Sequence, residues 1–165
     1  MENNRELNKI IREILIPKDN PKDTSQYQYF FVFLGGILEN NGFNRIFTLI
    51  GDKCGKTTLY TVLKETLLYA KKEHPEITSK PFFIDNSDEF FSKISYHDFV
   101  LKFVNGDYTA LCIDDLTFEH HNQLTPFFAT VMNNKPLFLT MNSENGNKLK
   151  KSMGFNESQI KYIKI

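Results

Sequence analysis

Short apolar runs alternate with helical patterns along most of this chain, and this alternation constrains the fold more than any other feature. The apolar runs are residues 45–50, 81–85, 109–114 and 136–142, with residues 160–165 as a possible last strand. Strands that are apolar on both faces are typical of a parallel sheet covered by helices on each side. We therefore expect an α/β fold with a mainly parallel sheet flanked by helices, and the pattern leaves the order of the strands open.

The segments between the apolar runs carry helical periodicity or helix-capping residues. The expected helices are residues 2–15, 29–39, 56–72, 96–105 and 121–133, and a short one that Ser87 caps. The stretch P-K-D-N-P-K-D-T-S-Q after the first helix indicates a linker. This predicts three parts: an amphipathic helix at 1–16, a linker at 17–27 and one domain at 28–165. The first helix either packs on that domain or binds a partner.

Composition excludes several classes of protein. The 165 residues suffice for one domain with a core, and 41% hydrophobic and 24% charged residues are ordinary for a globular chain. Cys54 and Cys112 are too few for a disulfide scaffold or a zinc site. His120 and His121 lack a set of metal-binding partners, so we interpret them as the solvated start of a helix.

Charge and hydropathy bound the partners and the location. The formal net charge is zero, so nucleic-acid binding would need a local basic patch. No stretch is typical of a signal peptide or of a membrane span. We therefore expect a cytoplasmic protein, or one inside a host cell if it is viral, without a membrane partner.

A glycine loop follows the first apolar run and precedes a predicted helix, as a nucleotide site requires. Backbone N–H groups at a helix start can bind phosphates, a lysine can reach the outer phosphates, and a hydroxyl can bind Mg²⁺. The predicted binding residues are Gly51, Asp52, Lys53, Cys54, Gly55, Lys56, Thr57 and Thr58, with Thr57 as a metal ligand. They predict a site for ATP and Mg²⁺, and a turn that contains G-K-T by chance is the alternative.

The loop is one residue shorter than the usual G-x-x-x-x-G-K-[ST] pattern. Only three residues separate Gly51 from Gly55. Either one loop residue is missing, or Ile50 occupies the position of the first glycine. Both descriptions change the surroundings of the β-phosphate, and both retain Lys56 and Thr57.

Two polar motifs follow later apolar runs, at the strand ends where parallel sheets bind ligands. A-L-C-I-D-D ends in Asp114, which would bind Mg²⁺, and Asp115, which would polarise the attacking water. K-P-L-F-L-T-M-N ends in Asn142, which would position that water or contact the γ-phosphate, with Thr140 as the lesser candidate. The predicted catalytic residues are Lys56, Asp114, Asp115 and Asn142.

These three motifs, in this order, resemble the phosphate loop (Walker A), acidic strand (Walker B) and sensor strand of additional-strand P-loop ATPases, including the AAA+ group. The stretch Y-F-F-V-F-L-G-G-I-L and the sensor strand are closest to superfamily 3 helicases of viral and plasmid replication. Bacterial replication initiator and helicase-loader ATPases are next nearest. The resemblance covers residues 28–145. It implies a three-layer P-loop NTPase that hydrolyses ATP in nucleic-acid replication, with single-stranded DNA or RNA, a homo-oligomer or a replication protein as partner.

The chain departs from these helicases in two ways. Between Asp115 and Asn142 lie 26 residues with one predicted helix, too few for the DNA-gripping hairpin of the family. No arginine follows Arg45, so a lysine would have to complete a neighbour's site as the finger residue; the candidates are Lys148, Lys150 and Lys151. An arginine finger accelerates GTPases by about 10³ to 10⁵, so we expect hydrolysis here to be slow or partner-dependent.

Two other functions fit the sequence. A degenerate, low-turnover nucleotide-binding module for a replication or packaging partner is favoured by the short loop and by the lack of a hairpin and an arginine finger. A small-molecule or nucleotide kinase is less favoured, because the lid of such an enzyme usually brings several arginines to the phosphates.

Overall fold

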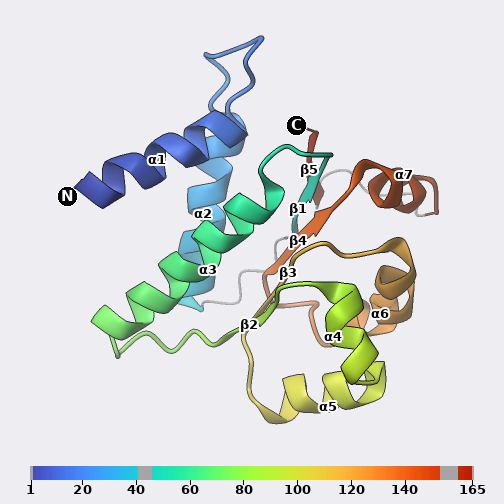
Figure 1. Ribbon diagram of the computed structural model, residues 1–165. Coiled ribbons are helices and arrows are strands. Elements are labelled where there is room, and N and C mark those ends of the chain that lie inside the picture. Colours follow the sequence, from blue (N-terminus) through green and yellow to red (C-terminus); the bar gives the residue numbers. More distant parts are fainter. Residues whose placement is uncertain (1, 41–45, 153–159, 165) are drawn as a thin grey trace.

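The computed structural model describes residues 2–40, 46–152 and 160–164, and Figure 1 shows how their helices and strands are arranged. The elements are α1 (Glu2–Leu15), α2 (Ser25–Glu39), β1 (Ile46–Ile50), α3 (Lys56–Glu73), β2 (Pro81–Ile84), α4 (Ser87–Lys93), α5 (Tyr96–Asn105), β3 (Ala110–Ile113), α6 (Phe118–Thr130), β4 (Leu137–Met141), α7 (Ser143–Ser152) and β5 (Ile160–Lys164). The predicted α/β class is confirmed. The outermost residues of two predicted strands, 45 and 165, lie outside the described residues.

The five strands form one sheet in the order β2-β3-β4-β1-β5, and every neighbouring pair is parallel. Strand β4 lies between β1 and β3, and its register aligns Met141 with Ile50 and Leu139 with Ile113. The carboxyl ends of β1, β3 and β4 therefore meet at one edge of the sheet. The polar residues that follow these strands are brought together there, as the candidate site requires.

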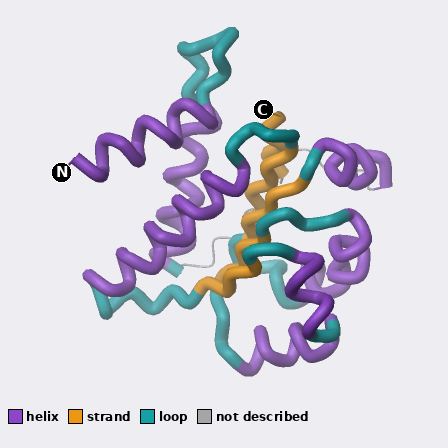
Figure 2. Tube along the Cα trace, viewed as in Figure 1, coloured by secondary structure: helices purple, strands orange, loops and turns teal. Residues whose placement is uncertain are grey.

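Helices cover both faces of the sheet, which Figure 2 shows as orange strands between purple helices. On one face α1, α2 and α3 pack on a cluster that includes Phe47 and Phe138, whose rings stack with centroids 5.4 Å apart. On the other face α4 to α7 pack on a second cluster that includes Leu111 and Leu139. Successive side chains of a strand point to opposite faces, so a strand covered on both sides must be apolar throughout. Among the described helices, none is long and apolar enough to cross a membrane.

Helix α1 packs on the same face as α2 and α3. Its residues Ile11 and Leu15 are buried in the cluster that these helices share with the sheet. The side chain of Asn8 accepts a hydrogen bond from the Tyr27 hydroxyl at 2.5 Å, and the Arg12 guanidinium lies over the Tyr27 ring. Helix α2 begins at Ser25, inside the predicted linker, and the Asp23 carboxylate accepts the Ser25 N–H at 3.0 Å.

Capping residues explain where the observed helices differ from the expected ones. Helix α4 is capped by Asn86, whose side chain accepts the Glu89 N–H at 2.9 Å, so the prediction that Ser87 caps it is wrong. Helix α6 begins at Phe118 rather than at 121, because the Thr117 hydroxyl caps it. Helix α7 was not predicted. Its sequence S-E-N-G-N-K-L-K-K-S has little apolar periodicity. The side chain of Asn142, directly before the helix, caps it by accepting the Asn145 N–H.

Candidate functional site

The loops after β1, β3 and β4 form the candidate site at the carboxyl edge of the sheet. The Gly51 N–H donates to the Met141 carbonyl at 3.2 Å, which joins the first loop to the end of β4. The Asp52 carboxylate accepts the Ser143 N–H at 3.1 Å, and hydrogen bonds from Ser143 hold the pKa of Asp52 below its usual value. The glycine loop is therefore attached at two points to the turn between β4 and α7.

Two residues in the left-handed region let the short loop close. Gly55 has a φ of 84° and lies directly before α3, and Lys53 has a φ of 51°. Glycine adopts this conformation at no steric cost, whereas a lysine there is uncommon and is typical of functional loops. The loop thus leads into the amino end of an 18-residue helix, whose free N–H groups favour anions.

Lys56 folds back across the loop that precedes it. Its ammonium donates a hydrogen bond to the Gly51 carbonyl and lies 4.0 Å from the Cys54 sulfur. An ammonium has three N–H groups, so donors remain for phosphate oxygens. Thr57 and Thr58, the next residues of α3, are exposed at the same helix start.

Asp114 is the buried carboxylate of the site, with 3% of its surface exposed. Its Oδ1 atom accepts a hydrogen bond from the Thr140 hydroxyl at 2.5 Å, and the Thr57 side chain lies close enough to affect the pKa of this carboxylate. Burial raises the pKa of Asp114, and the Thr140 hydroxyl and the nearby Thr57 side chain oppose that rise. The structure thus brings together the two predicted metal ligands, which lie far apart in the sequence.

The donor set fits Mg²⁺. This ion prefers hard oxygen ligands and usually takes only one or two from the protein, with water and phosphate oxygens supplying the others. Asp114 and Thr57 provide one carboxylate and one hydroxyl at a common point. Within the described ranges no group of three or more His, Cys, Asp or Glu side chains could hold a metal by itself.

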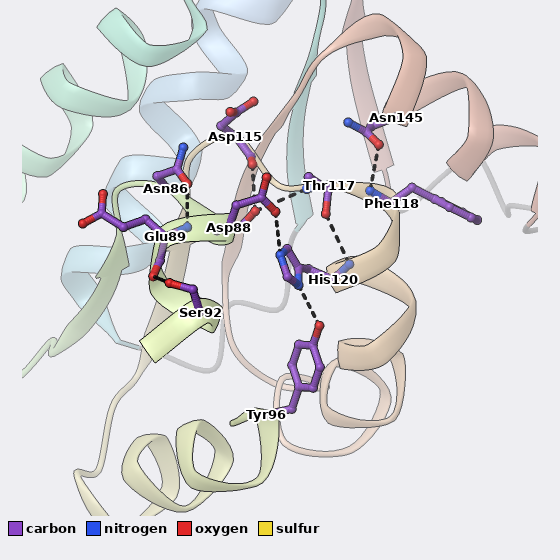
Figure 3. Close-up of polar contacts among 11 residues, drawn as sticks. Asn86, Asp88, Glu89, Ser92, Tyr96, Asp115, Thr117, Phe118, His120 and Asn145 are labelled. Carbon is purple, nitrogen blue, oxygen red and sulfur yellow. Dashed lines mark hydrogen bonds and ion pairs between the residues drawn. The ribbon is translucent and has the colours of Figure 1, made fainter. Parts of the chain in front are cut away.

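Asp115 is exposed while its backbone is held from two sides, and Figure 3 shows its carboxylate pointing away from the other labelled side chains. The Asp115 N–H donates to the Thr140 hydroxyl at 2.8 Å, and the Asp115 carbonyl accepts the hydroxyl of Ser87 at 2.8 Å. Its φ is 52°, and a non-glycine residue in this region is kept there by its surroundings. The fixed turn presents the carboxylate to solvent beside Asp114.

Thr140, the lesser candidate from the sequence, makes the contacts at the end of β4. Its hydroxyl bonds to both acidic residues, because the register of β3 and β4 places it level with Asp114. Asn142 instead caps α7, where its side-chain oxygen accepts the Asn145 N–H at 2.8 Å. The role of Asn142 toward water or phosphate stays a prediction. The register between β3 and β4 is what places Thr140, rather than Asn142, beside the acidic residues. This register cannot be predicted from the sequence of one strand.

The two adjacent histidines are not a solvated helix start, which corrects that interpretation. The His120 Nε2 atom lies 2.7 Å from Asp88 Oδ1 and its Nδ1 atom 2.7 Å from the Tyr96 hydroxyl, and 15% of the side chain is exposed (Figure 3). His121 is buried, and its Nδ1 atom has no hydrogen-bond partner within the described residues. Burial lowers the pKa of His121 to about 4. A helix that begins at Phe118 puts His121 on the buried face with Leu124, which the predicted start at 121 obscured.

The candidate finger residues lie on α7. Lys148 forms an ion pair with Glu144 of the same helix at 2.6 Å, while Lys150 and Lys151 are exposed. The role of these lysines toward a neighbouring molecule stays a prediction.

Comparison with known proteins assigns no family. No protein-family model matches this chain, and no curated protein matches it. Among solved structures, Saccharomyces cerevisiae RIF2 is a weak neighbour, with a TM-score of 0.47 and 11% sequence identity. The match covers 99% of this chain and 62% of the RIF2 chain. At this TM-score the likeness carries no argument about fold or function.

Proposed function

We propose that this protein binds ATP with Mg²⁺ and hydrolyses it, as a three-layer P-loop ATPase that acts in nucleic-acid replication. One observation carries the proposal: the Thr57 side chain, at the start of the helix after the glycine loop, lies close enough to the buried Asp114 carboxylate to lower its pKa. A turn that contained G-K-T by chance would not be expected to meet a buried carboxylate at the carboxyl end of another strand.

The sheet supports the same proposal. The motifs resemble those of additional-strand P-loop ATPases, and β4 lies between β1, which leads into the glycine loop, and β3, which ends at Asp114. The loop and the acidic residues are thus two strands apart. Neighbouring strands are about 4.8 Å apart, so the two strands are about 10 Å apart at the backbone, and the side chains of Thr57 and Asp114 approach each other across that distance.

Each residue has a distinct role in the proposed reaction. Lys56 and the N–H groups at the start of α3 bind the outer phosphates. Mg²⁺, when bound, would neutralise charge on the β- and γ-phosphates. Thr57 and Asp114 hold that ion, and the exposed Asp115 carboxylate accepts hydrogen bonds from the attacking water and orients it.

One contact favours the alternative, a low-turnover nucleotide-binding module for a replication or packaging partner. Lys56 bonds to the carbonyl of Gly51 within its own loop, and a phosphate must compete with that bond. The loop is short, and the lysines of α7 are the only finger candidates named by the sequence. Binding and turnover must therefore be measured separately.

Titration calorimetry with ATP and Mg²⁺ tests the binding proposal. We expect micromolar binding by the wild type, loss of binding in Lys56→Ala, and no change in Lys72→Ala, which removes an exposed lysine near the other end of α3. Absence of binding in the wild type would contradict the proposal. Turnover with and without single-stranded DNA then separates the two functions. An ATPase loses turnover and keeps binding in Asp115→Asn, whereas a wild type that binds without turnover is the module.

A further inference from the structure

Three lysines lie in the segments that lead into β2, β3 and β4, at the amino edge of the sheet opposite the candidate site. Lys80 directly precedes β2, Lys135 precedes β4 by two residues, and Lys102 lies in the last turn of α5. Strands β2, β3 and β4 are neighbours in this order, and adjacent strands are about 4.8 Å apart. Lys80 and Lys135 therefore flank the loop that leads into β3.

Two of these ammonium groups bind that loop directly. The Lys80 Nζ atom donates to the Gly106 carbonyl at 2.7 Å, and the Lys135 Nζ atom donates to the Tyr108 carbonyl at 2.8 Å. A neutral carbonyl takes one of the three N–H donors of each ammonium and leaves its charge in place. Both lysines thus keep donors for an anion.

Aromatic rings hold all three side chains in place. The ammonium groups of Lys80, Lys102 and Lys135 lie 4.8, 5.7 and 5.2 Å from the ring centroids of Tyr108, Phe82 and Phe103 respectively. These rings also contact one another, with Tyr108 4.7 Å from Phe82 and 5.6 Å from Phe103. A cation over a ring face is attracted to it. Because the side chains are already ordered, an anion that binds them loses less entropy in ordering them.

The lysines of this edge differ from several others in having no acidic partner. Lys64, Lys93 and Lys148 are paired with carboxylates, whereas no ion pair joins Lys80, Lys102 or Lys135 to an acidic side chain in the described part of the chain. Asp107 is the one acidic residue in the loop between α5 and β3, and it is exposed. Three lysines therefore surround a loop that holds one acidic residue, which gives a local excess of positive charge in a chain whose net charge is zero.

We propose that Lys80, Lys102 and Lys135 bind the phosphate backbone of single-stranded nucleic acid. The choice of nucleic acid as the partner rests on the proposed function. The positive charge and the prearranged donors rest on the contacts described above. Lysine binds phosphate as a point charge and reads no base, so binding is independent of sequence and weakens with salt. The surface lies at the opposite edge from Lys56 and Asp114, so nucleic acid and nucleotide can be bound at the same time.

Fluorescence anisotropy with a labelled oligothymidine and the full chain, without nucleotide, tests this surface. We expect Lys80→Gln, Lys102→Gln and Lys135→Gln together to weaken binding by about tenfold or more at low salt. The slope of log K against log salt should fall by about 2, because each phosphate contact on a single strand contributes about 0.7. A matched triple variant with Lys18→Gln, Lys22→Gln and Lys93→Gln has the same charge change elsewhere and should bind within about twofold of the wild type.

Asp107→Asn provides a test that misfolding cannot imitate. Removing the negative charge beside the lysines should tighten binding by about twofold, because the local positive excess grows. Asparagine tolerates the φ of 55° that Asp107 adopts, so the loop is preserved. If thermal unfolding shows that the triple variant is unfolded, Lys102→Gln alone replaces it, since this exposed lysine donates to no backbone carbonyl in the described contacts.

The proposal is overturned if the wild type does not bind the oligonucleotide, if the two triple variants bind equally, or if Asp107→Asn binds more weakly. Leu101 and Val104 are exposed on α5 beside Lys102, so a membrane surface is the competing partner. The proposal is also overturned if the chain binds vesicles rich in phosphatidylserine and does not bind the oligonucleotide. Failure of the ATP site would look different. Lys56→Ala should bind the oligonucleotide like the wild type, and the lysine triple variant should bind ATP like the wild type.

Discussion

The Thr140 hydroxyl lies 2.5 Å from the Oδ1 atom of Asp114 and donates a hydrogen bond to it. The same hydroxyl accepts the N–H of Asp115, so one buried side chain on β4 orients two successive residues at the end of β3. The spacing between the acidic residues and the glycine loop therefore depends on the middle strand as much as on the two motifs.

Replacement of Thr140 by valine keeps the shape of the side chain and removes the hydroxyl. The buried Asp114 carboxylate would lose a donor and the Asp115 N–H its acceptor, and an unpaired buried polar group costs about 1 to 3 kcal/mol. We expect the free energy of unfolding to fall by about this amount and ATP turnover to fall more than in Thr140→Ser, which retains the hydroxyl. Urea unfolding and a phosphate-release assay on both variants check this. Equal stability of the valine and serine variants would contradict the bridging role.

Replacement of Asp114 by asparagine is expected to stabilise the protein without nucleotide. Burial raises the pKa of Asp114 above its value in the unfolded chain. The contribution of Asp114 to the free energy of unfolding is therefore favourable below the unfolded pKa and is lost as the pH rises through the folded pKa. At neutral pH the buried charge is unfavourable, and asparagine removes it while keeping an oxygen for Thr140. We expect the free energy of unfolding to increase at pH 7, together with loss of the stabilisation that ATP and Mg²⁺ give the wild type. Thermal unfolding with and without ligand measures both, and a less stable Asp114→Asn without ligand would contradict the prediction.

His121 should make stability fall in mild acid. Its folded pKa is about 4, below the value of about 6.5 in an unfolded chain. The unfolded chain therefore binds more protons between these values, and the free energy of unfolding decreases as the pH is lowered through this window, by about 2 to 3 kcal/mol in total. His121→Leu should remove this part of the pH dependence, whereas His97→Gln, at an exposed position, should leave it in place. Urea unfolding at pH 7 and pH 5 distinguishes them, and parallel losses in all three proteins would refute the assignment.

Gly55 should not tolerate alanine. Its φ of 84° is unfavourable for any side chain, and an added Cβ would lie 3.0 Å from two side-chain carbons of Ile14. We expect Gly55→Ala to lower the free energy of unfolding by about 1 to 2 kcal/mol. Adding Ile14→Ala to Gly55→Ala should recover only the part of the lost unfolding free energy that comes from crowding between the two side chains. A double-mutant cycle isolates this part. Gly35, in the interior of α2 with open space around it, is the control, and Gly35→Ala should gain up to about 1 kcal/mol.

The strands and the glycine loop were predictable because their signals are local. A strand covered on both faces is a continuous apolar run, and the residues that follow β1 and β3 carry the polar groups. Other features depend on which strands and helices become neighbours, and this cannot be predicted from any one segment. They are the strand order, the position of Thr140 beside Asp114 and the contact of Ile14 with Gly55. Helix α7 depends on a cap from Asn142 rather than on periodicity. The burial of His121 could not be predicted, because a polar residue on a buried helix face looks the same in sequence as one in solvent.

The packing of α1 determines where the chain can be shortened. Ile11 and Leu15 are 3% and 1% exposed and lie against the helices that follow. A fragment that starts at Ser25 would leave the apolar sides of α2 and α3 open to water, and such surfaces promote aggregation. Ile14 would also be lost from beside Gly55. The first helix therefore belongs to the smallest piece of this chain that we expect to remain folded in solution.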